Sequence, residues 1–155
     1  MIKQISEIGN FIRRLRTEVR FGELSRAPLQ LLRLEWRGDV VECDWMARAA
    51  DPWDAGLPTI VAERNTSVQA LEDAVKVRDL LFSTLPDLSS GVFRVYREAE
   101  GSPSILIIAG KVTRKERVPA GVRSLAMRAK LVGFRFWLAD GVLKPLQLEE
   151  REMSL

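Results

Sequence analysis

The chain has 155 residues, enough for one domain with a buried core, and its composition of 46% hydrophobic and 29% charged residues is typical of globular proteins. It contains no histidine and one cysteine, which excludes imidazole catalysis, intrachain disulfides and cysteine-rich metal sites. The net charge of +3 is uneven, because residues 111–135 carry +7 and residues 38–110 carry −6. Such asymmetry is typical of a partner-binding surface, or of charged blocks that pack on each other.

No segment has the properties of a targeting or membrane-spanning sequence. The N-terminal stretch is charged and lacks the continuous apolar core of a secretory signal. The longest apolar run elsewhere, Ile105–Ala109, is too short to span a bilayer. We therefore expect a cytoplasmic protein with one domain over residues 1–148 and a frayed tail over residues 149–155.

Residues 2–20 predict an amphipathic helix, because apolar side chains recur at spacings of three and four. The arginines lie mostly off the apolar stripe, which is typical of a surface helix packed on a sheet. Two alternatives stay open: a basic helix lying on an anionic membrane, and a helix that pairs with a second copy. The stripe consists of Ile5, Ile8, Ile12, Leu15 and Val19.

Residues 29–46 predict a β-hairpin around which the rest of the chain is organised. Gly38-Asp39 suits a type II′ turn, which fixes the register of the two strands. A slip by one residue would expose the tryptophans, so the register is strongly specified. Cys43 is then expected to be a buried thiol rather than a reactive one. The predicted pairs are Trp36 with Val41, Leu34 with Cys43 and Leu32 with Trp45 on the apolar face, and Arg33 with Asp44 and Glu35 with Glu42 on the other.

A loop over residues 47–58 precedes a second helix predicted over residues 59–85. Thr66 and Gln69 match a capping box, which leaves open the alternative that a separate helix begins near Ser67. Its wide apolar face indicates that it is the helix most buried against the sheet.

Residues 92–97 and 105–112 predict a second hairpin, whose almost continuously apolar return strand is typical of a strand covered on both faces. Residues 118–133 fit either a helix or a strand, and we expect a helix. A third hairpin is predicted over residues 134–148, because Asp140-Gly141 is typical of a type I′ turn.

Helix and hairpin thus alternate three times along the chain. This order predicts an α+β fold, in which an antiparallel sheet built from three hairpins has two or three helices packed on one face. Residues 67–141 also resemble the BON domain in the order helix, GVFRVYREAEG, ILIIAGKVT, helix and final strand. The turn over residues 100–104 is longer than in that family, and we transfer no function from the resemblance.

Two groups of charged residues are the candidate functional residues. Paired carboxylates can act as acid and base or hold a hard cation, and clustered basic residues can bind phosphates. Both groups also fit solvated surfaces with salt bridges. The acidic cluster is Glu42, Asp44, Asp51 and Asp54, and the basic residues are Arg114, Arg117, Arg123, Arg128, Lys130 and Arg135.

The sequence contains no nucleophile with a recognisable base and no phosphate-binding loop, and the spacing of its carboxylates matches no calcium loop. We therefore predict a small protein-interaction or scaffolding module without catalytic activity, cofactor or metal, which binds a protein partner or a second copy of itself. The first alternative is nucleic-acid binding through the basic residues of segment 111–135. The second alternative is a carboxylate- or metal-dependent enzyme that uses the acidic segment 42–54.

Overall fold

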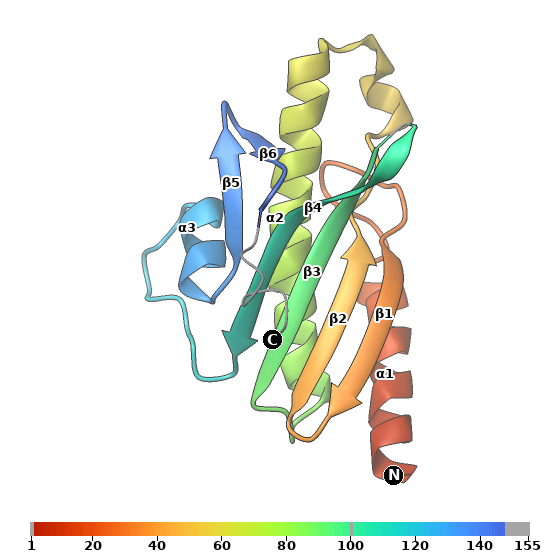
Figure 1. The fold of residues 1–155 in the computed structure, drawn as a ribbon, viewed down its shortest axis with the longest axis vertical. Helices are drawn as coiled ribbons and strands as arrows, with labels where there is room; N and C mark the ends of the chain where they lie inside the picture. The colour runs from red at the N-terminus through yellow and green to blue at the C-terminus, as the bar shows by residue number, and fades with distance from the viewer. Residues whose placement is uncertain (1, 100, 148–155) are drawn as a thin grey trace.

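The computed structural model describes the backbone of residues 2–99 and 101–147. Each α-helix in this part of the chain is followed by a pair of strands, as Figure 1 shows. Their bounds are α1 Ile2–Glu18, β1 Gln30–Arg37, β2 Val40–Met46, the 3₁₀ turn η1 Pro52–Gly56, α2 Thr59–Thr84, β3 Ser90–Ala99, β4 Ser102–Thr113, α3 Leu125–Leu131, β5 Arg135–Ala139 and β6 Val142–Lys144.

The strands form one mixed sheet in the order β1-β2-β3-β4-β5-β6. β2 and β3 pair in parallel, whereas the other neighbouring strands are antiparallel. The α+β class is confirmed, but the prediction of a purely antiparallel sheet is wrong. The cause is α2, because this 26-residue helix carries the chain back along the sheet and β3 starts at the same end as β2.

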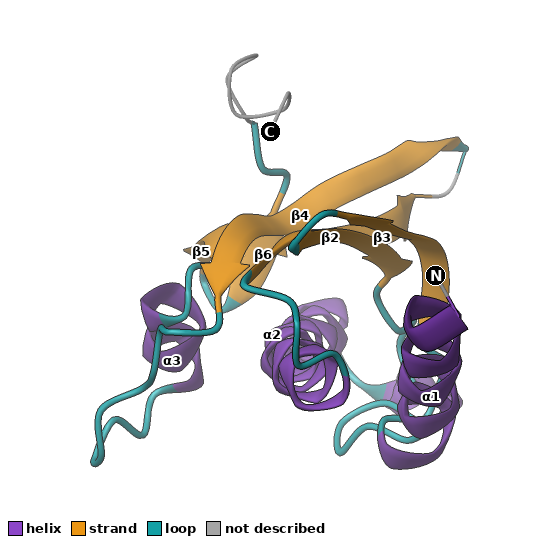
Figure 2. Cartoon of the chain, turned by 90° about the horizontal axis from the view of Figure 1, so that it is seen from below, coloured by secondary structure: helices purple, strands orange, loops and turns teal. Residues whose placement is uncertain are grey.

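The helices gather on one side of the sheet, which Figure 2 shows nearly edge-on. α2 lies under the middle strands, α1 under the β1 edge and α3 under β5. Aromatic rings join the strands at the centre of the core. The ring centroid of Trp45 is 5.6 Å from that of Phe93, which is 5.7 Å from that of Phe134.

The hairpin of β1 and β2 has the predicted register over most of its length. Trp36 lies opposite Val41, and Leu34 lies opposite Cys43. Gly38 has a φ of +61°, as the first central residue of a type II′ turn requires. The local turn chemistry therefore sets the pairing of the strands, as predicted.

A β-bulge between Leu31 and Arg33 changes the register toward the start of β1. Leu31, rather than Leu32, lies opposite Trp45, so the predicted pairing of Leu32 with Trp45 is wrong. Leu32 is 45% exposed, because the extra residue turns its side chain to the surface.

α2 continues without a break through Ser67, so no fresh start occurs there. The Thr66 hydroxyl donates to the carbonyl of Glu63, and the Gln69 side chain binds Leu24 and Asp73 instead of completing a capping box. Within the described residues, no helix has both the length and the apolar composition needed to cross a bilayer.

α3 is shorter than the helix predicted over residues 118–133. Ser124 caps its first turn by accepting from the N–H of Met127 at 3.3 Å, and Gly133, with a φ of +116°, follows its end. The turn at Asp140-Gly141 has φ values of +55° and +78°, which confirms type I′. The tail predicted over residues 149–155 lies outside the described residues.

Candidate interaction groove

An open groove of about 680 Å³ lies between α1 and the first strand of the sheet. α1 packs mainly against α2, and its side toward β1 lines the groove. The lining is mostly apolar, and its charged members are two arginines. Arg16 lies in α1, and Arg20 lies just beyond the C-terminal end of this helix. The lining residues are Ile12, Leu15, Arg16, Val19 and Arg20 on one side, and Pro28, Leu29, Gln30 and Leu31 on the other.

β1 is an edge strand, with β2 as its neighbour among the described strands. One side of its backbone therefore has no sheet partner, and such an edge is a template for pairing with another chain. The bulge at Leu32 and the charged residues Arg33, Glu35 and Arg37 limit indiscriminate pairing. The groove lies beside the part of β1 that precedes the bulge.

Arg48, in the loop after β2, fixes the end of α1 beside the groove. Its guanidinium donates to the carbonyl oxygens of Val19, of Arg20 at 2.9 Å and of Ala27 at 2.8 Å. Its Nε also donates to a carboxylate oxygen of Asp73 at 2.8 Å. Carbonyls at the end of a helix lack intrahelical partners, so a cation at this place satisfies and stabilises them.

Gln69 extends this network to the connection between α1 and β1. Its side-chain oxygen accepts from the N–H of Leu24 at 2.7 Å, and its nitrogen donates to Asp73 at 3.0 Å. A Cβ added at Gly22 would lie 2.3 Å from the Gln69 side chain, so any larger residue would displace this buried amide. Buried side chains of α2 thus hold the connection that leads to the groove.

Arg16 and Arg20 supply the charge of the groove, and both side chains are exposed. Within the described part of the chain, no carboxylate pairs with either of them. Arg14, by contrast, donates to Glu18 at 2.5 and 3.2 Å. The groove therefore combines an apolar lining with two arginines, Arg16 and Arg20, that form no ion pair with a carboxylate of the described residues.

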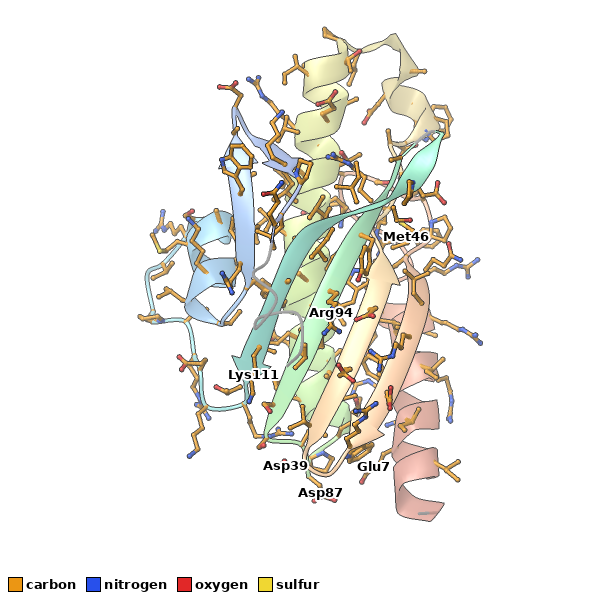
Figure 3. All side chains as sticks on the ribbon, in the orientation of Figure 1. Glu7, Asp39, Met46, Asp87, Arg94 and Lys111 are labelled. Atoms are coloured by element: carbon orange, nitrogen blue, oxygen red, sulfur yellow. The ribbon has the colours of Figure 1, made fainter. Side chains whose placement is uncertain are left out.

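The acidic candidates divide between two places. Glu42 and Asp44 lie on the sheet face turned away from the helices, where Arg33 and Arg94 pair with them at N–O distances of 3.0 to 4.0 Å. Figure 3 shows Arg94 in the middle of this face. Burial raises the pKa of Asp44, and the nearby Arg94 and Arg33 offset only part of that rise.

Asp51 and Asp54 lie in the loop between β2 and α2. The Asp51 carboxylate accepts from the N–H of Trp53 at 3.4 Å and from the N–H of Arg26 at 3.3 Å, so it caps the 3₁₀ turn that contains Asp54. Across the ranges that the structure describes, no group of three or more acidic or cysteine side chains is arranged to hold a metal ion. The enzymatic alternative stays a prediction.

One of the basic candidates has a structural role. Arg114 donates to the carbonyl oxygens of Phe82 at 2.7 Å, Leu85 at 2.6 Å and Leu88 at 2.8 Å. It therefore caps the C-terminal end of α2, and its guanidinium is occupied by the protein itself.

The other basic candidates are spread over the segment before α3, α3 itself and β5. Arg117, Arg123, Lys130 and Arg135 are exposed, whereas Arg128 is half-buried. The Lys130 ammonium lies 5.4 Å from the centroid of the Phe136 ring. Nucleic-acid binding by the basic residues stays a prediction. Arg114 is not a phosphate ligand in it, because its guanidinium binds carbonyl oxygens of the protein.

A second cavity, of about 780 Å³, lies between α2, the segment after β2 and the β3–β4 turn. Its charged lining residues have both signs, namely Arg48, Arg97, Glu63 and Glu98. Arg97 already donates to the carbonyl of Leu143 at 2.9 Å. This mixed lining favours no class of ligand, so the groove beside β1 is the stronger candidate site.

Comparison with protein-family models, curated proteins and solved structures found no match. The resemblance of residues 67–141 to the BON domain therefore has no support from a family model, although α2, β3, β4, α3 and β5 follow in the expected order. The candidate site rests on the geometry of this chain alone.

Part of this site could be predicted from the sequence. The apolar spacing places Ile12, Leu15 and Val19 on one face of a helix, but it identifies neither the arginines as groove residues nor residues 28–31 as the opposite wall. The available signal was the pair Arg16 and Arg20, which follow Leu15 and Val19 directly at the same spacing of four.

Proposed function

We propose that this protein is a non-catalytic interaction module that binds an extended segment of a partner protein along the free edge of β1. The observation that carries this proposal is an edge strand with a groove of about 680 Å³ beside it. In strand addition, backbone hydrogen bonds to the free edge supply affinity, and pockets for alternate side chains supply specificity.

The groove has the lining that such side chains require. The half-buried Ile12, Leu29 and Leu31 offer apolar surface to a bound segment, and Leu15 and Val19, which are 7% and 5% exposed, complete the lining. The end of α1 is held by Arg48, and the connection to β1 is held by Gln69. A site that is already fixed loses little conformational entropy on binding, so the contacts made there contribute more fully to affinity.

The test changes the peptide backbone, which leaves the protein untouched. Peptides of about ten residues are selected from a displayed random library, and their affinity is measured by fluorescence anisotropy. N-methylation of alternate residues removes the N–H donors on one side of an extended peptide. We expect methylation of one alternate set of residues to lower the affinity of the peptide by at least about tenfold, and methylation of the other set to lower it little.

Two results would contradict the proposal. Equal losses from both methylated sets would mean that the peptide does not pair as a strand. The absence of any enriched peptide would mean that the edge of β1 does not bind extended segments.

A further inference from the structure

The two arginines of the groove are four residues apart at the C-terminal end of α1. Arg16 is in the last turn of α1, and Arg20 is the second residue after its end, where Arg48 binds the Arg20 carbonyl at 2.9 Å. Four residues of an α-helix rise by about 6 Å along its axis, and the bond from the Val19 N–H to the Leu15 carbonyl at 3.2 Å extends the helical pattern to the residue before Arg20. Both side chains line the groove and are exposed, and within the described residues neither pairs with a carboxylate.

An extended strand repeats on one face with nearly the same spacing. Residues i and i+2 of a strand point to the same side and are about 6.6 Å apart. Residues i and i+1 point to opposite sides, so two adjacent carboxylates cannot both face α1. A strand added beside β1 can therefore present two carboxylates to Arg16 and Arg20 only when they alternate with another residue.

We propose that the partner segment carries Asp or Glu at positions i and i+2, which pair with Arg16 and Arg20 while neighbouring apolar side chains contact the groove lining. This inference rests on the proposed function, because it assumes that the segment binds β1 as a strand. The apolar lining formed by residues such as Ile12 and Leu29 favours a peptide over a polyanion, whose phosphates would leave that surface without contacts.

The probes are three synthetic peptides of about ten residues with valine and threonine elsewhere. The first carries Glu at i and i+2, the second has the same composition with Glu at i and i+1, and the third has Gln at i and i+2. Exposed ion pairs contribute little individually, so we expect the first peptide to bind about fivefold more tightly than the other two. Its advantage should shrink as salt is raised, because salt screens exposed charges.

The protein variants are the double change Arg16→Glu/Arg20→Glu and the control Arg13→Glu. Arg13 is also an exposed arginine of α1, but it does not line the groove. We expect the double variant to remove the preference for the i and i+2 peptide and the control to keep it. Thermal unfolding of each variant checks that α1 remains folded.

The outcomes separate this inference from the proposed function. If the Gln peptide binds as tightly as the first Glu peptide, the acidic partner is wrong and strand addition stands. If no peptide binds, both are wrong. An equal loss of preference in Arg13→Glu would indicate attraction by overall charge, and tighter binding of an oligothymidine of about ten nucleotides would indicate a nucleic-acid ligand; either result contradicts the inference.

Discussion

Arg48 and Asp73 form an ion pair from which water is excluded. Arg48 Nε donates to Asp73 Oδ2 at 2.8 Å, and the two side chains are 0% and 1% exposed. A buried ion pair is often no more stable than apolar side chains of the same volume, but removal of one partner leaves the other buried and uncompensated. The pair therefore fixes the end of α1 against α2, and it thereby fixes the position of the α1 residues that line the groove.

Replacement of Asp73 by alanine should lower the free energy of unfolding by about 3–5 kcal/mol, because Arg48 is then buried without its counter-charge. Urea denaturation measures this loss. The neighbouring Glu72 forms an exposed pair with Lys76 at 2.7 Å, so Glu72→Ala should cost only about 0.3–0.5 kcal/mol. A loss below about 1 kcal/mol for Asp73→Ala would contradict the burial of the pair.

The two tryptophans of the first hairpin should differ in their effect on stability. Trp45 is fully buried, whereas Trp36 is half-buried near the turn and its Nε1 donates to the carbonyl of Gly38 at 2.7 Å. We expect Trp45→Ala to cost about 3–5 kcal/mol and Trp36→Ala about half as much. Equal losses in chemical denaturation would contradict the difference in burial.

Cys43 should react slowly with thiol reagents in the folded protein. Its side chain is buried between strands, and burial raises the pKa of its thiol far above the ordinary value, with a further rise from Asp44. The thiolate is the reactive form, so labelling requires unfolding or local opening. Labelling with a chromogenic disulfide should be slow in buffer and fast in denaturant. Fast labelling in buffer would show that this face of the hairpin is open.

The stability of the protein should depend on pH through Asp44. Burial raises the pKa of Asp44 in the folded protein, so the folded state holds this proton more tightly than the unfolded chain. The resulting stabilisation is fully present below the ordinary Asp pKa of about 3.9 and is lost as pH rises through the folded value. Asp44→Asn lacks this titration, so its free energy of unfolding should improve relative to the parent across that window. A difference that is constant with pH would contradict the shift.

The turns of this fold could be predicted because their cause is local. Gly38 and the pair Asp140-Gly141 adopt the positive φ values that their turn types require, and each fixes the hairpin around it. The apolar stripe that contains Leu15 and Val19 also predicts α1 without any knowledge of its partner.

The remaining features depend on contacts between distant residues. The parallel pairing of β2 with β3 depends on how α2 crosses the sheet, and the bulge at Leu32 depends on how β1 meets β2. The bond between Arg48 and Asp73 joins residues 25 positions apart, and no periodicity predicts it. The groove was missed for the same reason, since α1 packs on α2 and leaves part of its stripe uncovered.

Backbone amide exchange of β1 tests the central claim most directly. Exchange rates are measured with and without a saturating amount of the peptide that carries Glu at i and i+2. We expect slower exchange at alternate amides within Gln30–Arg37, because hydrogen bonds to an added strand protect the free edge. Saturated binding with unchanged exchange in β1, or with protection confined to residues 111–135, would contradict strand addition at this edge.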